Sequence, residues 1–169
     1  AYCAHHGVPV VPQGGNTGYC GGATPDSTGT QAIVSLERMT GVRSLDRIGF
    51  TISVDAGATL QAIHDVAGAA GLAFGLSLGS QGSCTIGGNI ATNAGGISVL
   101  RYGMARDLVL GLEVVLPDGS IFDDMRALRK NNTGYDVKQL FIGGEGSLAI
   151  IPGAVLKLHP MPETHATAW

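Results

Sequence analysis

The chain has 169 residues, of which 44% are hydrophobic and 14% charged, with 13 acidic and 10 basic residues and a net charge of −3. This composition is typical of a globular unit of one or two lobes and excludes a disordered chain. It also predicts no nucleic acid partner, because proteins that bind nucleic acids carry a basic surface that neutralises phosphates.

The cysteines and histidines argue against a disulfide framework or a metal site. Cys3, Cys20 and Cys84 are odd in number and far apart, which favours free thiols in a reducing compartment, so we expect a cytoplasmic protein. The five histidines lack the spacing of metal ligands, and we expect no metal site. All apolar stretches are shorter than the ~18 residues of a membrane helix, which predicts a soluble chain.

The first part of the chain is predicted to consist of short strands and two helices. A helix end is expected before Gly7, and a second helix is expected from an N-cap at Thr59 to about Ala70, where Gly71 stops it. Apolar runs predict the first three strands, and the alternation of apolar with small or polar residues predicts the fourth. These strands are expected over residues 8–11, 32–36, 42–46 and 48–55.

The last part of the chain predicts a hairpin and a further strand. Residues 108–123 contain two apolar runs around a Pro-Asp-Gly turn, which is typical of a hairpin. Residues 126–134 carry three basic residues and predict a solvent-facing loop, and residues 135–141 predict a short helix. A glycine loop over 143–147 leads into an apolar strand.

Three segments, 7–29, 75–100 and 143–147, share glycine, small hydroxyl residues, Asn or Gln, and almost no charge. Such segments supply backbone N–H groups at close range, which is how proteins hold a diphosphate without fixed cations. In the second segment, Thr85 predicts a short helix whose first amides point at an anion, and Gly87 and Gly88 let that anion approach. Tight turns alone would explain one such loop better than three.

The motifs PQGGNTG, GSCTIGGNIATNAGG, RYG, GLEVVLPDG and KNNTGYDVKQLFIGGEGSLAII resemble, in order and spacing, the FAD-binding domain of the vanillyl-alcohol oxidase/p-cresol methylhydroxylase type. The similarity covers about residues 4–158 and is greatest to the branch of D-2-hydroxyglutarate dehydrogenases, D-lactate dehydrogenases and the FAD subunit of glycolate oxidase. It implies an α+β fold of two FAD-binding subdomains, truncated at both ends. The implied parts are residues 1–46, 47–160 and, as the start of a linker to a missing substrate domain, 161–169.

The resemblance also implies which residues contact FAD. Residues 12–18 would wrap the pyrophosphate, 79–85 would line the isoalloxazine and ribityl region, 87–89 would continue the phosphate contact, 92–96 would run along the flavin, and 145–150 would meet the adenine or ribose. The implied cofactor-binding residues are Pro12, Gln13, Gly14, Gly15, Asn16, Thr17, Gly18, Gly79, Ser80, Ser83, Cys84, Thr85, Gly87, Gly88, Asn89, Thr92, Asn93, Ala94, Gly95, Gly96, Glu145, Gly146 and Ile150.

Non-covalent FAD is implied, because relatives that attach FAD covalently often carry a histidine where this chain has Asn16. Cys84 is expected to be a small buried lining residue rather than the site of a thioether. The implied reaction is oxidation of a D-2-hydroxy acid to a 2-oxo acid, with electrons passing to an electron-transfer protein, a quinone or oxygen. No catalytic side chain is assigned, and Arg101, Tyr102 and Arg106 are expected to be structural or solvated.

Three alternatives remain at this stage. In the first, the chain binds FAD without catalysing a reaction by itself. In the second, Ser77 in the motif GLSLG is the nucleophile of a serine hydrolase. In the third, GEGSLA, residues 144–149, is a nicotinamide-binding fingerprint. The last two require a helix directly after the motif, which neither sequence favours. Exposed apolar surface on an incomplete domain further predicts a homo-oligomer or poor solubility.

Overall fold

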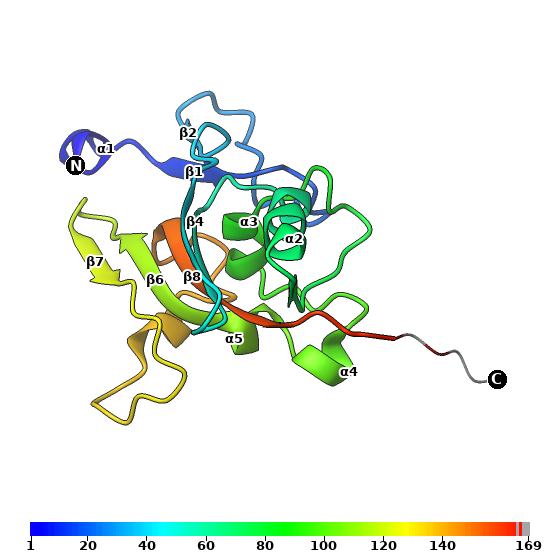
Figure 1. Cartoon of the computed structure of the whole chain (residues 1–169). Helices are drawn as coiled ribbons and strands as arrows, with labels where there is room; N and C mark the ends of the chain where they lie inside the picture. Colours follow the sequence, from blue (N-terminus) through cyan, green and yellow to red (C-terminus); the bar gives the residue numbers. More distant parts are fainter. Residues whose placement is uncertain (165, 167–169) are drawn as a thin grey trace.

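The computed structural model describes residues 1–164 and 166, and it contains two sheets of different size (Figure 1). A small parallel sheet pairs β1 (Val10–Gln13) with β2 (Ala32–Ser35). The six-stranded sheet has the order β3-β4-β8-β6-β7, with β5 paired to β8, and all its pairings are antiparallel. Its strands are β3 (Val42–Asp46), β4 (Thr51–Asp55), β5 (Leu72–Phe74), β6 (Val109–Val115), β7 (Ile121–Asp124) and β8 (Ile150–Pro160).

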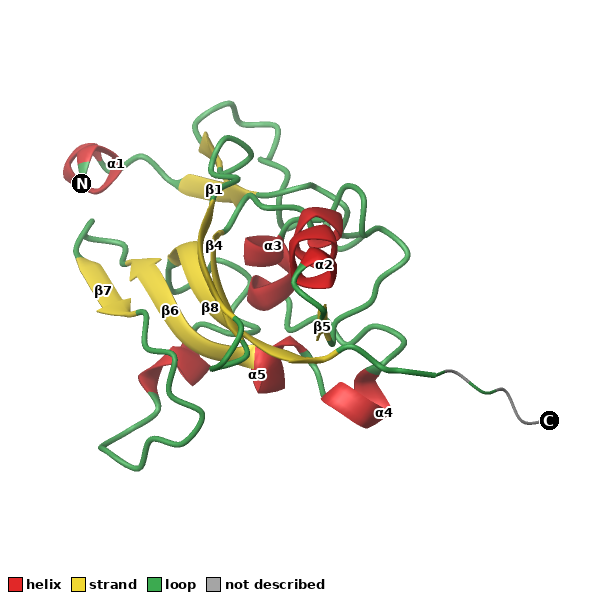
Figure 2. Ribbon diagram, in the orientation of Figure 1, coloured by secondary structure: helices red, strands yellow, loops and turns green. Residues whose placement is uncertain are grey.

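Short helices connect the strands, and α2 and α3 lie on the same face of the large sheet (Figure 2). Thr59 caps α2 as predicted, since its hydroxyl accepts a hydrogen bond from the Ala62 amide at 3.2 Å. The helices are α1 (Tyr2–His6), α2 (Leu60–Ala69), α3 (Ile86–Ala91), α4 (Val99–Tyr102), α5 (Ala105–Leu108) and the 3-10 helix η1 (Val137–Leu140).

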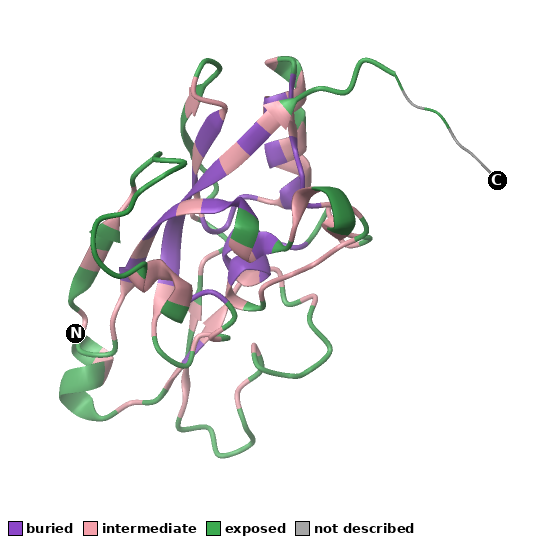
Figure 3. Ribbon diagram, turned by 90° about the horizontal axis from the view of Figure 1, so that it is seen from below, coloured by how far each residue is buried: buried purple, intermediate pink, exposed green. Residues whose placement is uncertain are grey.

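The hydrophobic core lies between the large sheet and helices α2 and α3, where the buried segments gather in Figure 3. Strand β8 runs through its centre and contributes Leu156 and Leu158, both fully buried. The helices contribute Leu60, Ile63, Ile86 and Ile90. Burial of each such side chain stabilises the fold by about 1.5–3 kcal/mol, so this layer fixes the position of α3 and of the loops beside it.

Two strand predictions are wrong in their bounds. The first strand starts at Val10 rather than Val8, because the Val8 amide donates to the Cys3 carbonyl and so belongs to the end of α1. The fourth starts at Thr51, because residues 47–50 form a turn in which the Asp46 carboxylate accepts from two amides, and Ile48 is exposed.

Most of the other predicted helices and strands are present, and three short elements were missed. The remaining predicted helices and strands occur close to their expected positions, whereas β5, α4 and α5 were not predicted. The division into subdomains at residue 46 stays a prediction; β3 pairs with β4, which favours a boundary before Val42. Over residues 1–164 and 166, the structure contains no helix that is both long and apolar enough to span a membrane.

Candidate functional site

A cavity of about 410 Å³ lies where the loop after β1 meets α3 and the segment before β8. This volume is within the range of small-molecule sites. All three glycine-rich segments contribute to it, as their shared composition predicted. The predicted cofactor-binding residues that line the cavity are Pro12, Gln13, Gly14, Gly15, Asn16, Thr17, Gly18, Thr85, Gly87, Gly88, Asn89, Thr92, Glu145, Gly146 and Ile150.

The remaining predicted residues do not line this cavity. They are the residues that the resemblance assigns mainly to the flavin ring, and their role stays a prediction. Cys84 is buried as expected, with Asn89 Nδ2 3.5 Å from its sulfur, and its predicted contact with the flavin stays a prediction. The residues outside the cavity are Gly79, Ser80, Ser83, Cys84, Asn93, Ala94, Gly95 and Gly96.

Sequence reasoning missed part of the lining. Gly21 and Gly22 continue the first glycine loop, so the composition of that loop was a signal for them. The apolar residues carry no such signal, because Leu, Ile and Ala also fill any core. The lining residues that were missed are Cys20, Gly21, Gly22, Ala23, Leu36, Ala91, Ala149 and Ile151.

The glycine pair of the first loop lets β1 approach α3 closely. A Cβ added at Gly15 would overlap the Ser83 carbonyl oxygen, and one added at Gly14 would overlap the Thr85 hydroxyl. The approach is held by the Gly15 amide, which donates to Thr85 Oγ1 at 3.2 Å. Side chains at these two positions would therefore push one wall of the cavity away from the other.

Several backbone N–H groups at the cavity have no hydrogen-bond acceptor within residues 1–164 and 166. Most of them follow one another in the loop after β1, and others lie in α3 and in the segment before β8. Successive free amides of this kind form a concave anion site. Free amides in these three places include those of Gly14, Asn16, Thr17, Gly18, Gly88 and Gly146.

The predicted role of the first amides of α3 is only partly correct. The amides of Ile86 and Gly87 donate to the carbonyls of Ala58 and Ala56, at 2.9 and 2.8 Å. They close α3 onto the segment before α2 and are not available to a ligand. Only the Gly88 amide is left free in the first turn, so most of the anion-binding donors come from the loop after β1.

The charge of the cavity is low. Glu145 is the one carboxylate in its lining, and Asp, Lys, Arg and His are absent from the lining residues. Glu145 adopts a left-handed φ of 50°, and its amide donates to the Ala91 carbonyl at 2.9 Å, which ties the loop to the end of α3. A diphosphate in this cavity would be bound by backbone dipoles instead of side-chain cations.

These features fit an FAD diphosphate. The cavity offers free amides and close backbone approach, and no side-chain cation of the described residues lines it. Backbone amides at close range are donors that can bind a dinucleotide diphosphate without a cation. Among the described histidines, none lines the cavity.

The hydrolase and nicotinamide alternatives lack their structural context. The next helix after Ser77 is α3, which starts nine residues later, and no hydrogen bond joins Ser77 to a histidine among the described residues. The GEGSLA segment leads into strand β8 rather than a helix. Neither motif therefore lies at the junction of strand, turn and helix that it requires.

The three residues expected to be structural or solvated have distinct surroundings. Arg106 donates to the Gln139 side chain and to the carbonyls of Gln139 and Ile142, so it is structural. Tyr102 packs against His159 with ring centroids 4.7 Å apart. Arg101 is exposed above the Tyr102 ring.

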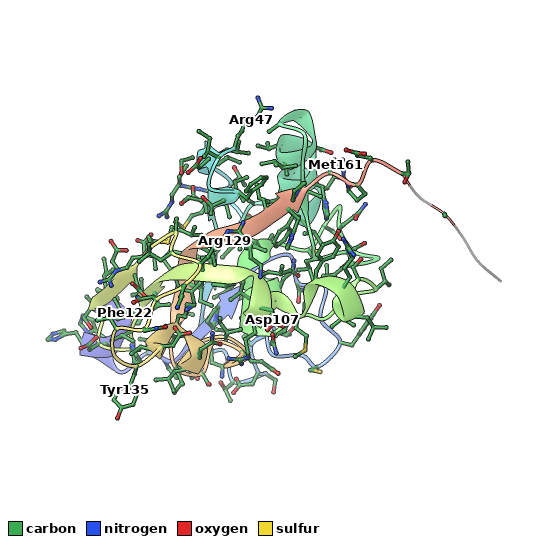
Figure 4. All side chains as sticks on the ribbon, turned by 60° about the horizontal axis from the view of Figure 1, so that its bottom comes forward. Arg47, Asp107, Phe122, Arg129, Tyr135 and Met161 are labelled. Atoms are coloured by element: carbon green, nitrogen blue, oxygen red, sulfur yellow. The ribbon has the colours of Figure 1, made fainter. Side chains whose placement is uncertain are left out.

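A second, more polar groove lies under the loop 126–136, on the side of the sheet that faces the viewer in Figure 4. Arg129 donates there to the carbonyls of Phe50 and Leu158, and Tyr135 projects away from the chain. The Lys138 ammonium holds the pKa of the Asp136 carboxyl below its usual value. Within the described residues, no group of three His, Cys, Asp or Glu side chains is placed to hold a metal ion.

Comparison with known proteins identifies the group to which the chain is similar. It is 47% identical over 163 residues to a mitochondrial D-2-hydroxyglutarate dehydrogenase of Bos taurus, covering 96% of this chain and 30% of that protein. It is 43% identical to a D-2-hydroxyglutarate–pyruvate transhydrogenase of Saccharomyces cerevisiae, covering 96% of this chain and 32% of that protein. The chain thus spans about a third of the length of these relatives.

A solved structure of alkyldihydroxyacetonephosphate synthase superposes with a TM-score of 0.84 at 26% identity, covering 96% of this chain and 29% of that chain. The resemblance and the α+β FAD-binding fold inferred from the sequence are therefore confirmed.

The prediction of a cytoplasmic location is wrong, because relatives from Bos taurus and Rattus norvegicus are named as mitochondrial. Free thiols indicate a reducing environment and do not by themselves specify the compartment.

A family model described as an FAD binding domain matches residues 1–124. The chain belongs to this FAD-binding domain family, and FAD is its cofactor.

Proposed function

We propose that this chain is the FAD-binding module of a mitochondrial dehydrogenase that oxidises a D-2-hydroxy acid to the 2-oxo acid. The observation that carries the proposal is the cavity with its free backbone amides, formed by the three segments whose motifs resemble this family. D-2-Hydroxyglutarate is the first substrate to test, because the Bos taurus and Saccharomyces cerevisiae relatives are named for it. D-Lactate and glycolate are the comparison substrates.

In this proposal the residues of the chain bind and orient the cofactor. The amides of Gly14, Asn16, Thr17 and Gly18 hold the diphosphate, while Thr85 keeps the loop against α3 through the Gly15 amide. The chemistry that FAD supplies when bound is acceptance of a hydride at flavin N5. We assign no catalytic side chain to this chain, and the residues that grip the substrate carboxylate belong to a separate substrate domain.

FAD is proposed to bind without a covalent bond. Asn16 lines the cavity where covalent relatives often carry a histidine, and Cys84 is buried with its sulfur against Asn89. An electron-transfer protein, a quinone or oxygen would accept the electrons.

The first test is the visible absorption spectrum of the purified chain after addition of FAD and gel filtration, followed by acid precipitation. Retained flavin bands that appear in the acid supernatant support a non-covalent FAD module. Colour that stays in the pellet contradicts the non-covalent assignment. A chain that takes up no FAD under native conditions, while its circular dichroism shows it to be folded, contradicts the proposed function.

The catalytic part of the proposal is tested with dye reduction. The chain alone is expected to show no turnover of D-2-hydroxyglutarate. A fusion with the substrate domain of the Bos taurus relative is expected to reduce the dye with D-2-hydroxyglutarate and with D-lactate or glycolate more slowly. Turnover by the chain alone would contradict the assignment of substrate binding to a separate domain.

A further inference from the structure

One wall of the cavity is a segment without regular secondary structure, residues 16–25. Seven of its ten residues line the cavity, and most of the segment is exposed on its other side. It belongs to the long connection between the parallel strands β1 and β2. A connection of this length without helix or strand is uncommon in a compact domain and is usually functional.

This segment has very few hydrogen bonds to the rest of the molecule. Within residues 1–164 and 166, the one hydrogen bond that links it to another part of the chain runs from Gln13 Nε2 to the Ala23 carbonyl, at 2.7 Å. A second hydrogen bond, from the Thr24 amide to the Gly21 carbonyl, is internal to the segment. The opposite wall is tied more firmly, since the amides of Gly143 and Glu145 donate to carbonyls at the end of α3.

Gln13 is well placed to hold the segment. It ends strand β1, is partly buried and lines the cavity itself. Its backbone carbonyl is fixed by the Leu36 amide at 2.9 Å, so its side chain extends from a firm base. Ala23 lies ten residues further along the chain and also lines the cavity. The side-chain amide therefore closes a loop that otherwise has no anchor between Gly15 and Asp26.

We propose that Gln13 is a positioning residue that holds segment 16–25 closed over the dinucleotide, and that opening of this segment admits and releases FAD. The proposal rests on the proposed function. It adds a positioning role to the contact with the pyrophosphate that the sequence resemblance implied for Gln13, and that contact stays a prediction.

Loss of this hydrogen bond is expected to speed FAD release about fivefold, which corresponds to a net hydrogen bond of ordinary strength. The Gln13→Glu variant keeps the size of the side chain but, when ionised, offers no donor to the Ala23 carbonyl. The Gln13→Met variant removes the donor without adding charge. Both variants are therefore expected to release FAD faster and to increase the backbone motion of residues 16–25.

The test uses the full 169-residue chain and two measurements. FAD release is followed by the rise of flavin fluorescence after dilution, and the backbone order parameters of residues 16–25 are measured by NMR relaxation in the FAD-free chain. The Asn132→Asp variant is the matched control, because it makes the same change from amide to carboxyl at an exposed loop position outside the cavity lining. The control is expected to keep the FAD release rate within twofold of the parent chain and to leave the order parameters unchanged.

Acidification gives a readout that loss of packing would not produce. As the pH falls from 7 to about 4, through the ordinary range of a glutamate carboxyl, the side chain introduced by Gln13→Glu takes up a proton and regains a donor, so its FAD release slows towards the parent rate measured at the same pH. The Gln13→Met variant has no such recovery.

Three outcomes overturn the proposal: order parameters of 16–25 that are unchanged in both variants, order parameters that fall throughout the chain, or FAD release that is no faster than in the control. Failure of the parent chain to bind FAD would instead overturn the proposed function, and the order parameters of the FAD-free chain would still decide the role of Gln13.

Discussion

The two sheets of this protein are held in different ways. The six-stranded sheet has a continuous apolar core, with residues such as Ile52, Leu112 and Leu156 fully buried. The small parallel sheet β1–β2 has one buried apolar side chain, Val11, and it is joined to α3 by close backbone contacts at Gly14 and Gly15. Packing therefore stabilises one region, whereas the other depends on backbone proximity and a few hydrogen bonds.

This difference separates stability from ligand contact. The cavity lies at the junction of the two regions and takes most of its free amides from the loop after β1, which contributes little to the core. Loops with few packed side chains can expose backbone donors and still be positioned by the rigid sheet beside them. Changes in the large sheet should thus lower stability, and changes at the junction should lower FAD binding.

The largest effect on stability is expected from Leu156→Ala at the centre of β8. Truncating a fully buried leucine leaves a cavity, so the free energy of unfolding should fall by about 3–4 kcal/mol in urea titrations. The control Leu148→Ala, whose side chain is half exposed, should change it by less than about 0.5 kcal/mol. Equal losses in the two variants would show that β8 does not hold the core.

Gly15→Ala is expected to break the junction. Its new methyl group would overlap the Ser83 carbonyl, so the free energy of unfolding should fall by about 1–3 kcal/mol. FAD affinity should fall at least tenfold, measured by flavin fluorescence. Gly18→Ala is the control for stability, because its added Cβ meets no atom within 4 Å. A Gly15→Ala variant with unchanged FAD affinity would contradict the role of close backbone approach.

Arg43→Met tests whether polar contacts also hold the large sheet. Arg43 bridges Asp55 on β4 and Glu113 on β6, at 2.6 Å each, and passes over Gly153 of β8. The ion pairs are partly exposed and screened, so we expect a loss of only about 1 kcal/mol, which shrinks in 0.5 M salt. A loss comparable to that of Leu156→Ala would mean that packing is not the main stabilising force there.

The smallest effect concerns His159 on β8. Burial lowers the pKa of its imidazole below the usual value, and the nearby cations Lys157, Arg129 and Arg101 lower it further. The unfolded chain therefore binds a proton near pH 6.5 that the folded chain does not, so stability falls as the pH drops through this range and is fully present above it. Urea midpoints at pH 7.5 and 5.5 should differ less in His159→Phe than in the parent or in the exposed control His5→Gln.

Much of the fold could be predicted because local signals agree with the final structure. Gly7 adopts the left-handed φ of 64° that ends α1, Thr59 caps α2, and the Pro-Asp-Gly turn joins β6 to β7. The glycine-rich composition also predicted which three segments meet at the cavity, since backbone donors at close range require small residues wherever they occur.

The sequence by itself determined most of the helices, strands and donor loops, because caps, turns and composition act over a few residues, whereas the short β5, α4 and α5 were missed. Only the tertiary structure decided which donors stay free. The amides of Ile86 and Gly87 donate to the carbonyls of Ala58 and Ala56, respectively, and the carboxamide of Gln13 donates to the carbonyl of Ala23. These partners are set by how distant segments pack around the large sheet, and no local pattern records that packing.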